Sequence, residues 1–484
     1  MRIIGNDPKT PRQTQVVASG TLSTGDTVVV NSDGTVSAVA EISVSFSAGT
    51  PVVVDSTPTN VEFVNTVYDP QNEKVIVIYS YTASADEGYA AVGTVSGSSI
   101  TFGTPVQFAS QAREIGAAYY GSGKIIIVFR NGANFNYGHA IAGTVSGNSI
   151  SFGTSQSYQN SDCRDNVVGC DPTTGKILIA YKDLGSSGYG YCKGATLSGT
   201  TFSFGTRSQY ANVVDWQDIS FDESQGNFLL VNTDNTNSSY GEIRAVTVSG
   251  TTATPYGSTY YNSAATYMAA LSYDSTNEKT VIAYRDGGNS NKPTTIVVSL
   301  SGTTISLGSE TVVDASGFGV YMGAAYNSTD GVHTITYYDA NNSNYGTAVE
   351  GTVSGTSISF GSPITFESAT SSWNAPVYDA STNKVVNAYT DGGNSNRTTA
   401  TVISNSGSST NITATNFIGT AQTGASDGNG VVVNIKGAID ENQSGLTAGQ
   451  SYYVQTDGSL GTTAADPSVF AGTAVSATKL IVKG

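Results

Sequence analysis

The sequence is short of charge, and most of all of positive charge. Charged residues make up 12% of the 484 residues, with 21 Lys and Arg against 37 Asp and Glu, which gives a formal net charge of −16. A nucleic-acid partner is excluded on this basis, because neutralising phosphates requires clustered Lys and Arg. An anionic membrane surface would repel the chain for the same reason.

Cysteine and histidine are also scarce. The sequence has three cysteines without a CxxC spacing (Cys163, Cys170 and Cys192) and two widely separated histidines (His139 and His333). These spacings argue against a Cys/His metal site, and the odd number of cysteines argues against a disulfide framework. We therefore expect the cysteines to be buried and structural, and we expect neither a metal nor a cofactor.

Targeting segments and common catalytic motifs are missing as well. The first residues, MRIIGNDP, lack the apolar core of a signal peptide, and no stretch is long and apolar enough to span a bilayer. Synthesis in a cytoplasm without membrane insertion is expected. The chain has no HExxH motif and no P-loop, and the turns DPQNEK, DPTTGK and DSTNEK lack the trailing aromatic of the glycosidase turn SxDxGxxW. We therefore predict no catalytic residue.

What the chain has in abundance is turn formers and β formers in a regular repeat. One anchor is an aromatic or small residue followed by a polar turn, and a second is a Ser-Gly hairpin turn. The first occurs at Tyr68-Asp69, Tyr119-Tyr120, Cys170-Asp171, Phe221-Asp222, Tyr273-Asp274, Tyr326-Asn327 and Tyr378-Asp379, in steps of 51 to 53 residues. The second occurs at Gly97, Gly147, Gly199, Gly250, Gly302, Gly355 and Gly407. Two independent anchors with one period indicate seven structural repeats.

Each repeat has the pattern of four short strands. In the first, these are VEFVNTVYD, KVIVIYSYT, YAAVGTVSG and SSITFGTPVQF. Four strands in about 50 residues are typical of a propeller blade. We therefore predict an all-β, seven-bladed β-propeller over residues 40–415, with blades that begin near 61, 111, 161, 213, 264, 316 and 369. A solenoid is the alternative, although its units are usually shorter and it needs capping repeats.

The closing strand of the seventh repeat stands at the front of the chain. The segment ISVSFSAGTPVVV, residues 42–54, resembles ITFGTPVQF and ISFGSPITF, and no such segment follows Gly407. An N-terminal strand that completes the last blade would remove an exposed sheet edge. The alternative is that residues 411–419 complete the blade.

The two ends of the chain resemble each other. LSTGDTVVVNSDGTV (22–36) aligns without gaps to LTAGQSYYVQTDGSL (446–460). Because ring closure brings both ends together, residues 1–39 and 416–484 are expected to form one small β-domain.

The C-terminal sequence GLTAGQSYYVQTDGSLGTTAADPSVFAGTAVSATKLIVKG resembles the C-terminal region of virion structural and tail-fibre-like proteins of tailed bacteriophages, above all marine and cyanobacterial ones. The resemblance implies a place on a virion, in several copies, with other virion proteins bound through the small β-domain. It implies no catalytic residue.

One group of residues is a candidate binding site. Pairs that enter the innermost strands stand seven and six places before each anchor, and both tryptophans occupy this position. Aromatic rings, Arg and carboxylates at a channel rim are what a sugar-binding pocket uses. The candidate residues are Arg113, Arg164, Asp215, Trp216, Tyr267, Tyr321 and Trp373. The alternative is that these side chains only fill the channel.

The function expected from these observations is a surface-displayed tail or fibre-type virion protein whose propeller attaches to a host surface glycan. A capsid decoration or tail-wall protein without a ligand is the structural alternative. A glycan-degrading hydrolase is the third hypothesis, and the lack of a recognisable acid/base pair argues against it.

Overall fold

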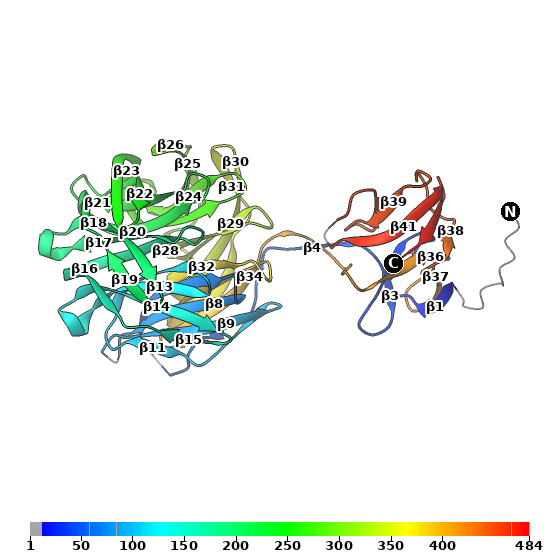
Figure 1. Ribbon diagram of the computed structural model, residues 1–484, viewed down its shortest axis with the longest axis horizontal. Helices are drawn as coiled ribbons and strands as arrows, with labels where there is room; N and C mark the ends of the chain where they lie inside the picture. Colours follow the sequence, from blue (N-terminus) through cyan, green and yellow to red (C-terminus); the bar gives the residue numbers. More distant parts are fainter. Residues whose placement is uncertain (1–11, 58, 84, 466, 484) are drawn as a thin grey trace, which may run out of the picture. The chain divides into compact units, whose positions relative to one another are not determined.

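The computed structural model describes residues 12–57, 59–83, 85–465 and 467–483, which form two compact units. The larger unit is Ser45–Ser406, and the smaller unit contains the described parts of Met1–Val44 and Gly407–Gly484. The expected all-β class is confirmed, since strands in antiparallel sheets make up both units (Figure 1). The helical segments among the described residues are short 3-10 turns, at Gly132–Asn134, Leu184–Ser186, Gly287–Asn289 and Gly392–Asn394. In these parts of the chain no helix has the length and apolarity to cross a membrane.

Within the described residues, the larger unit consists of seven antiparallel meanders. The first strands, called inner strands below, are β7 (Val61–Asp69), β12 (Arg113–Gly121), β16 (Gln156–Asp171), β20 (Ser208–Asp222), β23 (Thr252–Asp274), β28 (Gly319–Asn327) and β32 (Ile364–Asp379). The second strands are β8 (Lys74–Tyr81), β13 (Lys124–Asn131), β17 (Lys176–Asp183), β21 (Asn227–Asp234), β24 (Lys279–Asp286), β29 (Val332–Asp339) and β33 (Lys384–Asp391). The third strands are β9 (Glu87–Ser96), β14 (Tyr137–Ser146), β18 (Tyr189–Ser198), β22 (Tyr240–Ser249), β25 (Lys292–Ser301), β30 (Tyr345–Ser354) and β34 (Arg397–Ser404).

In five of the seven meanders the outer edge is formed by short strands. They are β10 (Ser99–Phe102), β11 (Val106–Ala109), β15 (Ser149–Phe152), β19 (Thr201–Phe204), β26 (Thr304–Leu307), β27 (Thr311–Val312) and β31 (Ser357–Phe360). The inner strands β16, β20, β23 and β32 are long because their first residues also pair with the third strand of the preceding meander.

Local chemistry explains these elements. The second strands are apolar on both faces, as in Ile125–Phe129, where every side chain is fully buried between neighbouring meanders. The anchor aspartates shape the next turn, since the Asp69 carboxylate accepts the Gln71 amide hydrogen at 3.0 Å, and Asp171 repeats this contact with Thr173. The three cysteines are buried and unpaired, as expected.

The last meander takes its outer edge from the front of the chain. β5 (Ser47–Ala48) and β6 (Val52–Val53) both pair antiparallel with β34. Gly49 occupies the position of Gly103, the glycine in the Phe-Gly turn (FG turn) of the first meander. The Gly49 amide donates a hydrogen bond to Val402 O at 2.8 Å, and the Gly103 amide donates one to Val92 O in the same way. A Cβ on Gly49 would lie 1.9 Å from Ser98 O in the first meander, as one on Gly103 would from Asn148 O in the second. The junction between the last and first meanders thus repeats an internal one.

The inner strands also contact one another in sequence, and β32 contacts β7. The Asn65 side chain donates to Ile115 O at 2.9 Å, and the Thr66 hydroxyl donates to Ala375 O at 2.9 Å. β7 is therefore bonded to the second inner strand on one side and to the last on the other.

The boundaries of the units differ from the expected ones at 39/40 and 415/416. β4 (Glu41–Val44) pairs with β35 (Gly407–Thr410) inside the smaller unit. The expected propeller span of 40–415 and closing strand of 42–54 both include residues that this ladder holds in the smaller unit. Residues 411–419 do not complete the last meander, because β36 (Phe417–Ala421) pairs with strands of the smaller unit.

The smaller unit contains two five-stranded sheets. One has the order β1 (Gln13–Val17), β37 (Gly430–Asn434), β36, β2 (Thr27–Val30) and β3 (Val36–Ala38); the other has β38 (Ile439–Asp440), β42 (Lys479–Val482), β41 (Val469–Ser476), β39 (Ser451–Val454) and β40 (Leu460–Gly461). The two segments of similar sequence fold alike. Each is a hairpin in which an aspartate accepts the backbone amide two residues on, Asp33 from Thr35 and Asp457 from Ser459, both at 2.9 Å.

Candidate functional site

Every inner strand contains the same irregularity. The register against the second strand shifts near the start of that pairing in each, and a residue there has a left-handed backbone with φ between 47° and 56°. These seven residues, called the left-handed ring below, are Phe63, Glu114, Asp165, Trp216, Met268, Tyr321 and Trp373. None is glycine, although this conformation is uncommon for other residues and an outlier for bulky ones.

Side-chain amides on the next inner strand hold several members of the ring in place. Asn166 donates to Glu114 O at 3.0 Å, and Gln217 donates to Asp165 O at 3.0 Å. Asn374 donates to Tyr321 O at 3.2 Å. All three amide side chains are buried, so each satisfies a carbonyl that the bulge takes out of the strand ladder.

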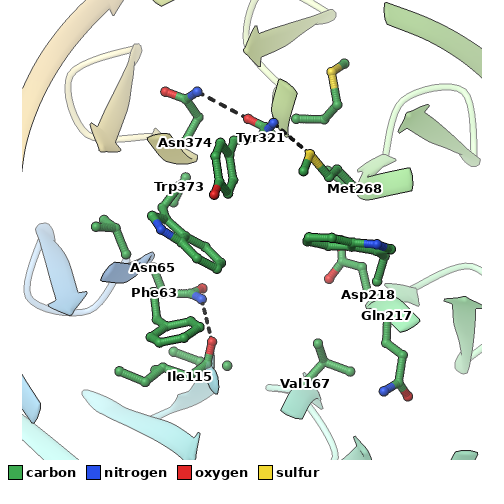
Figure 2. A pocket seen from close by; sticks show the side chains of 18 of the residues that line it. Phe63, Asn65, Ile115, Val167, Gln217, Asp218, Met268, Tyr321, Trp373 and Asn374 are labelled. Carbon is green, nitrogen blue, oxygen red and sulfur yellow. Dashed lines mark hydrogen bonds between the residues drawn. The ribbon is translucent and has the colours of Figure 1, made fainter. Parts of the chain in front are cut away.

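The ring and the residues that follow it line a central cavity of about 600 Å³ in the larger unit (Figure 2). Each of the seven inner strands contributes three or four lining residues, including one member of the left-handed ring. The volume is typical of small-molecule sites in proteins. The ring members are only half-buried, because they face this open space.

One side of the cavity is aromatic. The rings of Phe63 and Trp373 lie 4.6 Å apart between centroids, and those of Tyr321 and Trp373 lie 4.9 Å apart, with tilts of 50° and 43°. Figure 2 shows Phe63, Trp373 and Tyr321 next to one another along this wall. We call these three residues the aromatic arc. It offers hydrophobic ring faces to a ligand in the cavity.

The other side carries carboxyl groups. Burial, followed by the charges of Glu114 and Asp215, raises the pKa of Asp165 to about 8 against the smaller effect of Lys182. Burial raises the pKa of Glu114 despite a hydrogen bond from the Asp165 amide. Burial also raises the pKa of Asp218 to about 6, although its oxygens accept amide hydrogens from Ile219 and Leu271, both at 2.8 Å. Perturbed carboxyls in a cavity are typical of functional sites.

Three of the residues predicted from sequence line this cavity, namely Trp216, Tyr321 and Trp373. The other four precede the ring members and lie outside the lining. Arg113 pairs with Asp86 at 2.7 Å, Asp215 pairs with Lys182, Tyr267 lies under Arg285 at 4.5 Å, and Arg164 is exposed. Only the second member of each pair, which has the left-handed backbone, lines the cavity.

Sequence reasoning omitted five important lining residues. Phe63, Glu114, Asp165 and Met268 stand at the same repeat position as both tryptophans, and this shared position was the signal that could have selected them. Asp218 has no such signal, because its equivalents in the other repeats are uncharged.

The pKa of Asp165 predicts how stability depends on pH. The pKa is about 8 in the folded chain against an ordinary value of 3.8 for an aspartate, so the folded state holds this proton more tightly. The stabilisation is complete below the unfolded pKa and is lost as pH rises through about 8. Between pH 5 and pH 9, the free energy of unfolding of Asp165→Asn should therefore rise by more than about 1 kcal/mol relative to that of wild type. One pKa unit corresponds to about 1.4 kcal/mol, and the expected value is set lower because solvent reaches part of the group. Urea unfolding at both pH values tests this, and an equal difference at both would contradict it.

Comparison with known proteins shows a fold but no family. No protein-family model and no curated protein sequence matches the chain. Among solved structures, the BP39L lectin from Burkholderia pseudomallei matches with a TM-score of 0.54 and 9% identity, over 73% of this chain and 98% of the lectin. A lectin from Aleuria aurantia matches with a TM-score of 0.40 and 13% identity over 64% of this chain and 99% of its own, and the Hadza microbial sialidase Hz136 with 0.42 and 10% over 64% and 68%. The likeness to the BP39L lectin shows a β-propeller-like fold for this chain.

Proposed function

We propose that the larger unit is a seven-bladed β-propeller closed by residues 47–53, and that its central cavity binds a carbohydrate. The observation that carries the proposal is the left-handed ring, which directs one side chain from each inner strand into a single cavity. The blade count is supported by the seven meanders, and the closure by Gly49 in its FG-turn position.

The strain in the ring supports a binding role. A left-handed backbone costs a non-glycine residue about 1–2 kcal/mol, and glycine would remove this cost. The chain nevertheless has Trp, Tyr, Phe and Met at these positions, where their side chains face open space. Strained residues persist where function needs them.

The aromatic arc beside carboxyl groups suits a sugar. Ring faces stack on the apolar face of a pyranose, while carboxyl oxygens accept hydrogen bonds from its hydroxyls. The BP39L protein, which is similar in fold, is a lectin, which is consistent with carbohydrate binding in a fold of this kind.

We further propose that the chain is a component of a phage virion that binds a glycan of the host surface. The support is the C-terminal sequence that resembles virion structural proteins, together with a terminal unit that has a core of its own. In this proposal the smaller unit attaches the chain to the particle, in several copies, and the larger unit carries the binding site.

A glycoside hydrolase is the second candidate, because Glu114 and Asp165 follow each other in the ring and both have a raised pKa. We propose binding without turnover. Incubation of the purified chain with oligosaccharides that it binds should return them intact by mass spectrometry. Release of shortened products that Glu114→Gln abolishes would establish the hydrolase.

A divided chain tests the assignment of roles to the two units. Residues 45–406 alone should bind the same glycans as the full chain but should not join particles, because the larger unit retains its own core. The readouts are glycan-array binding and recovery of the tagged segment with purified virions. Normal incorporation of 45–406 would refute attachment through the smaller unit.

A further inference from the structure

The charged side chains that line the cavity are all acidic. Glu114, Asp165 and Asp218 contribute carboxyl groups, and none of the lining residues, all of which the structure describes, is Lys, Arg or His. A cavity that binds an acidic sugar needs basic side chains to pair with the carboxylate of the sugar.

The basic residues whose charges act on Glu114 and Asp165 lie outside the cavity lining. Arg113 pairs with Asp86 at 2.7 Å, and Arg130 bonds Asp162 at 2.7 Å. Lys182 pairs with Asp215, and exposed Arg164 is outside the lining. The first three pairs keep basic groups in contact with acids that lie outside the cavity lining.

We propose that the cavity selects a carbohydrate with a protonated amino group, such as an oligomer of unacetylated glucosamine. This inference rests on the proposed carbohydrate site and adds its charge preference. The ammonium group would pair with the carboxyl groups of Glu114 and Asp165, while the sugar ring stacks on the aromatic arc. The electron-rich faces of Trp373 and Tyr321 also attract a cation. A sugar carboxylate would meet acidic groups, with no basic side chain in the cavity lining.

Proton linkage gives the preference a pH signature. A bound cation favours the ionised form of Asp165. In the free chain, burial and the charges of Glu114 and Asp215 raise the pKa of this group to about 8, while Lys182 lowers it by a smaller amount. Below that pH, binding must release a proton. The affinity for a permanently charged trimethylammonium glucosamine oligomer should therefore rise as pH increases from 6 to 8 and then level off.

The test compares three matched tetrasaccharides by calorimetry with the full chain at pH 6 and 150 mM salt, where unspecific attraction to a chain of net charge −16 is screened. They are the β-1,4-linked glucosamine tetramer, its N-acetylated form and a uronic acid tetramer. We expect the amino form to bind at least about tenfold more tightly than the other two, since charge-assisted hydrogen bonds are the strong ones.

Two variants separate the cavity from general charge. Glu114→Gln with Asp165→Asn should abolish the preference for the amino form. Glu223→Gln, which removes a negative charge from an exposed turn outside the lining, should keep it. Thermal unfolding shows whether each variant is folded. The single variant Glu114→Gln gives a second measure of how the preference for the amino form depends on the cavity acids.

The outcomes separate this inference from the proposal beneath it. Equal or tighter binding of the N-acetylated tetramer, lost in Trp373→Ala, would overturn the charge preference and leave the carbohydrate site intact. A preference that survives the double variant would also overturn it. Absence of binding by all three tetrasaccharides would overturn both.

Discussion

Replacing Trp216 and Trp373 together by alanine should weaken glycan binding more than tenfold. Each ring contributes on the order of 1 kcal/mol through stacking, and about 1.4 kcal/mol corresponds to one decade in affinity. Trp373 should contribute more of the lost affinity than Trp216, because its ring packs against both Phe63 and Tyr321, which lose this contact in the variant. The readout is the dissociation constant for the glucosamine tetramer by calorimetry.

The double variant should still fold, because both indoles face the cavity and are only half-buried. Trp216→Gly is a second form of the test, since glycine accepts the left-handed backbone at this position without strain. Tyr256→Ala is the matched control, because Tyr256 is 41% exposed and does not line the cavity. Unchanged affinity in the folded double variant would support the alternative that these rings only fill the channel.

The second large effect is expected at the closing junction. Gly49→Ala places a Cβ 1.9 Å from the Ser98 carbonyl oxygen, so either the N-terminal segment or the first meander must shift. Because such overpacking typically costs about 1–3 kcal/mol, the variant should unfold at a lower temperature and expose the edge of β34 to association. Calorimetry and light scattering measure both consequences.

Two glycine variants serve as references for that experiment. Gly103→Ala creates the same 1.9 Å contact, with Asn148, between the first and second meanders, and it should cost a similar amount. Gly257→Ala meets no atom within 4 Å and should be neutral. If Gly49→Ala leaves the unfolding temperature as unchanged as Gly257→Ala does, residues 47–53 do not join the last meander to the first.

The repeats could be found in the sequence because turns have strict local requirements. Asp69 and five of its six equivalents accept amide hydrogens in the turn, the exception being Tyr120. Gly97 and five of its six equivalents have a positive φ of about 60°. The hairpin turn expected at Gly407 is not formed, because Gly407 is the first residue of β35 and pairs with β4. Gly49 was visible for a similar reason, since only glycine fits against a neighbouring carbonyl. The unit boundary was placed wrongly because the β4–β35 ladder belongs to no repeat and has no such signature.

The left-handed ring was harder to predict from sequence. Its seven members share a backbone conformation but no side-chain chemistry, so Glu114 and Met268 do not look alike in an alignment of repeats. The bulge also changes the alternation of faces. That is why Arg113 and Asp215 were grouped with the cavity, whereas their partners Asp86 and Lys182 hold them outside it.

The most direct test uses the two tryptophans as built-in reporters. They are the only tryptophans in the sequence, and both line the cavity. Tryptophan emission should therefore change saturably as the glucosamine tetramer is added, with the dissociation constant that calorimetry gives. Unchanged emission at concentrations where calorimetry shows a saturated site would place the ligand elsewhere and contradict binding in the cavity.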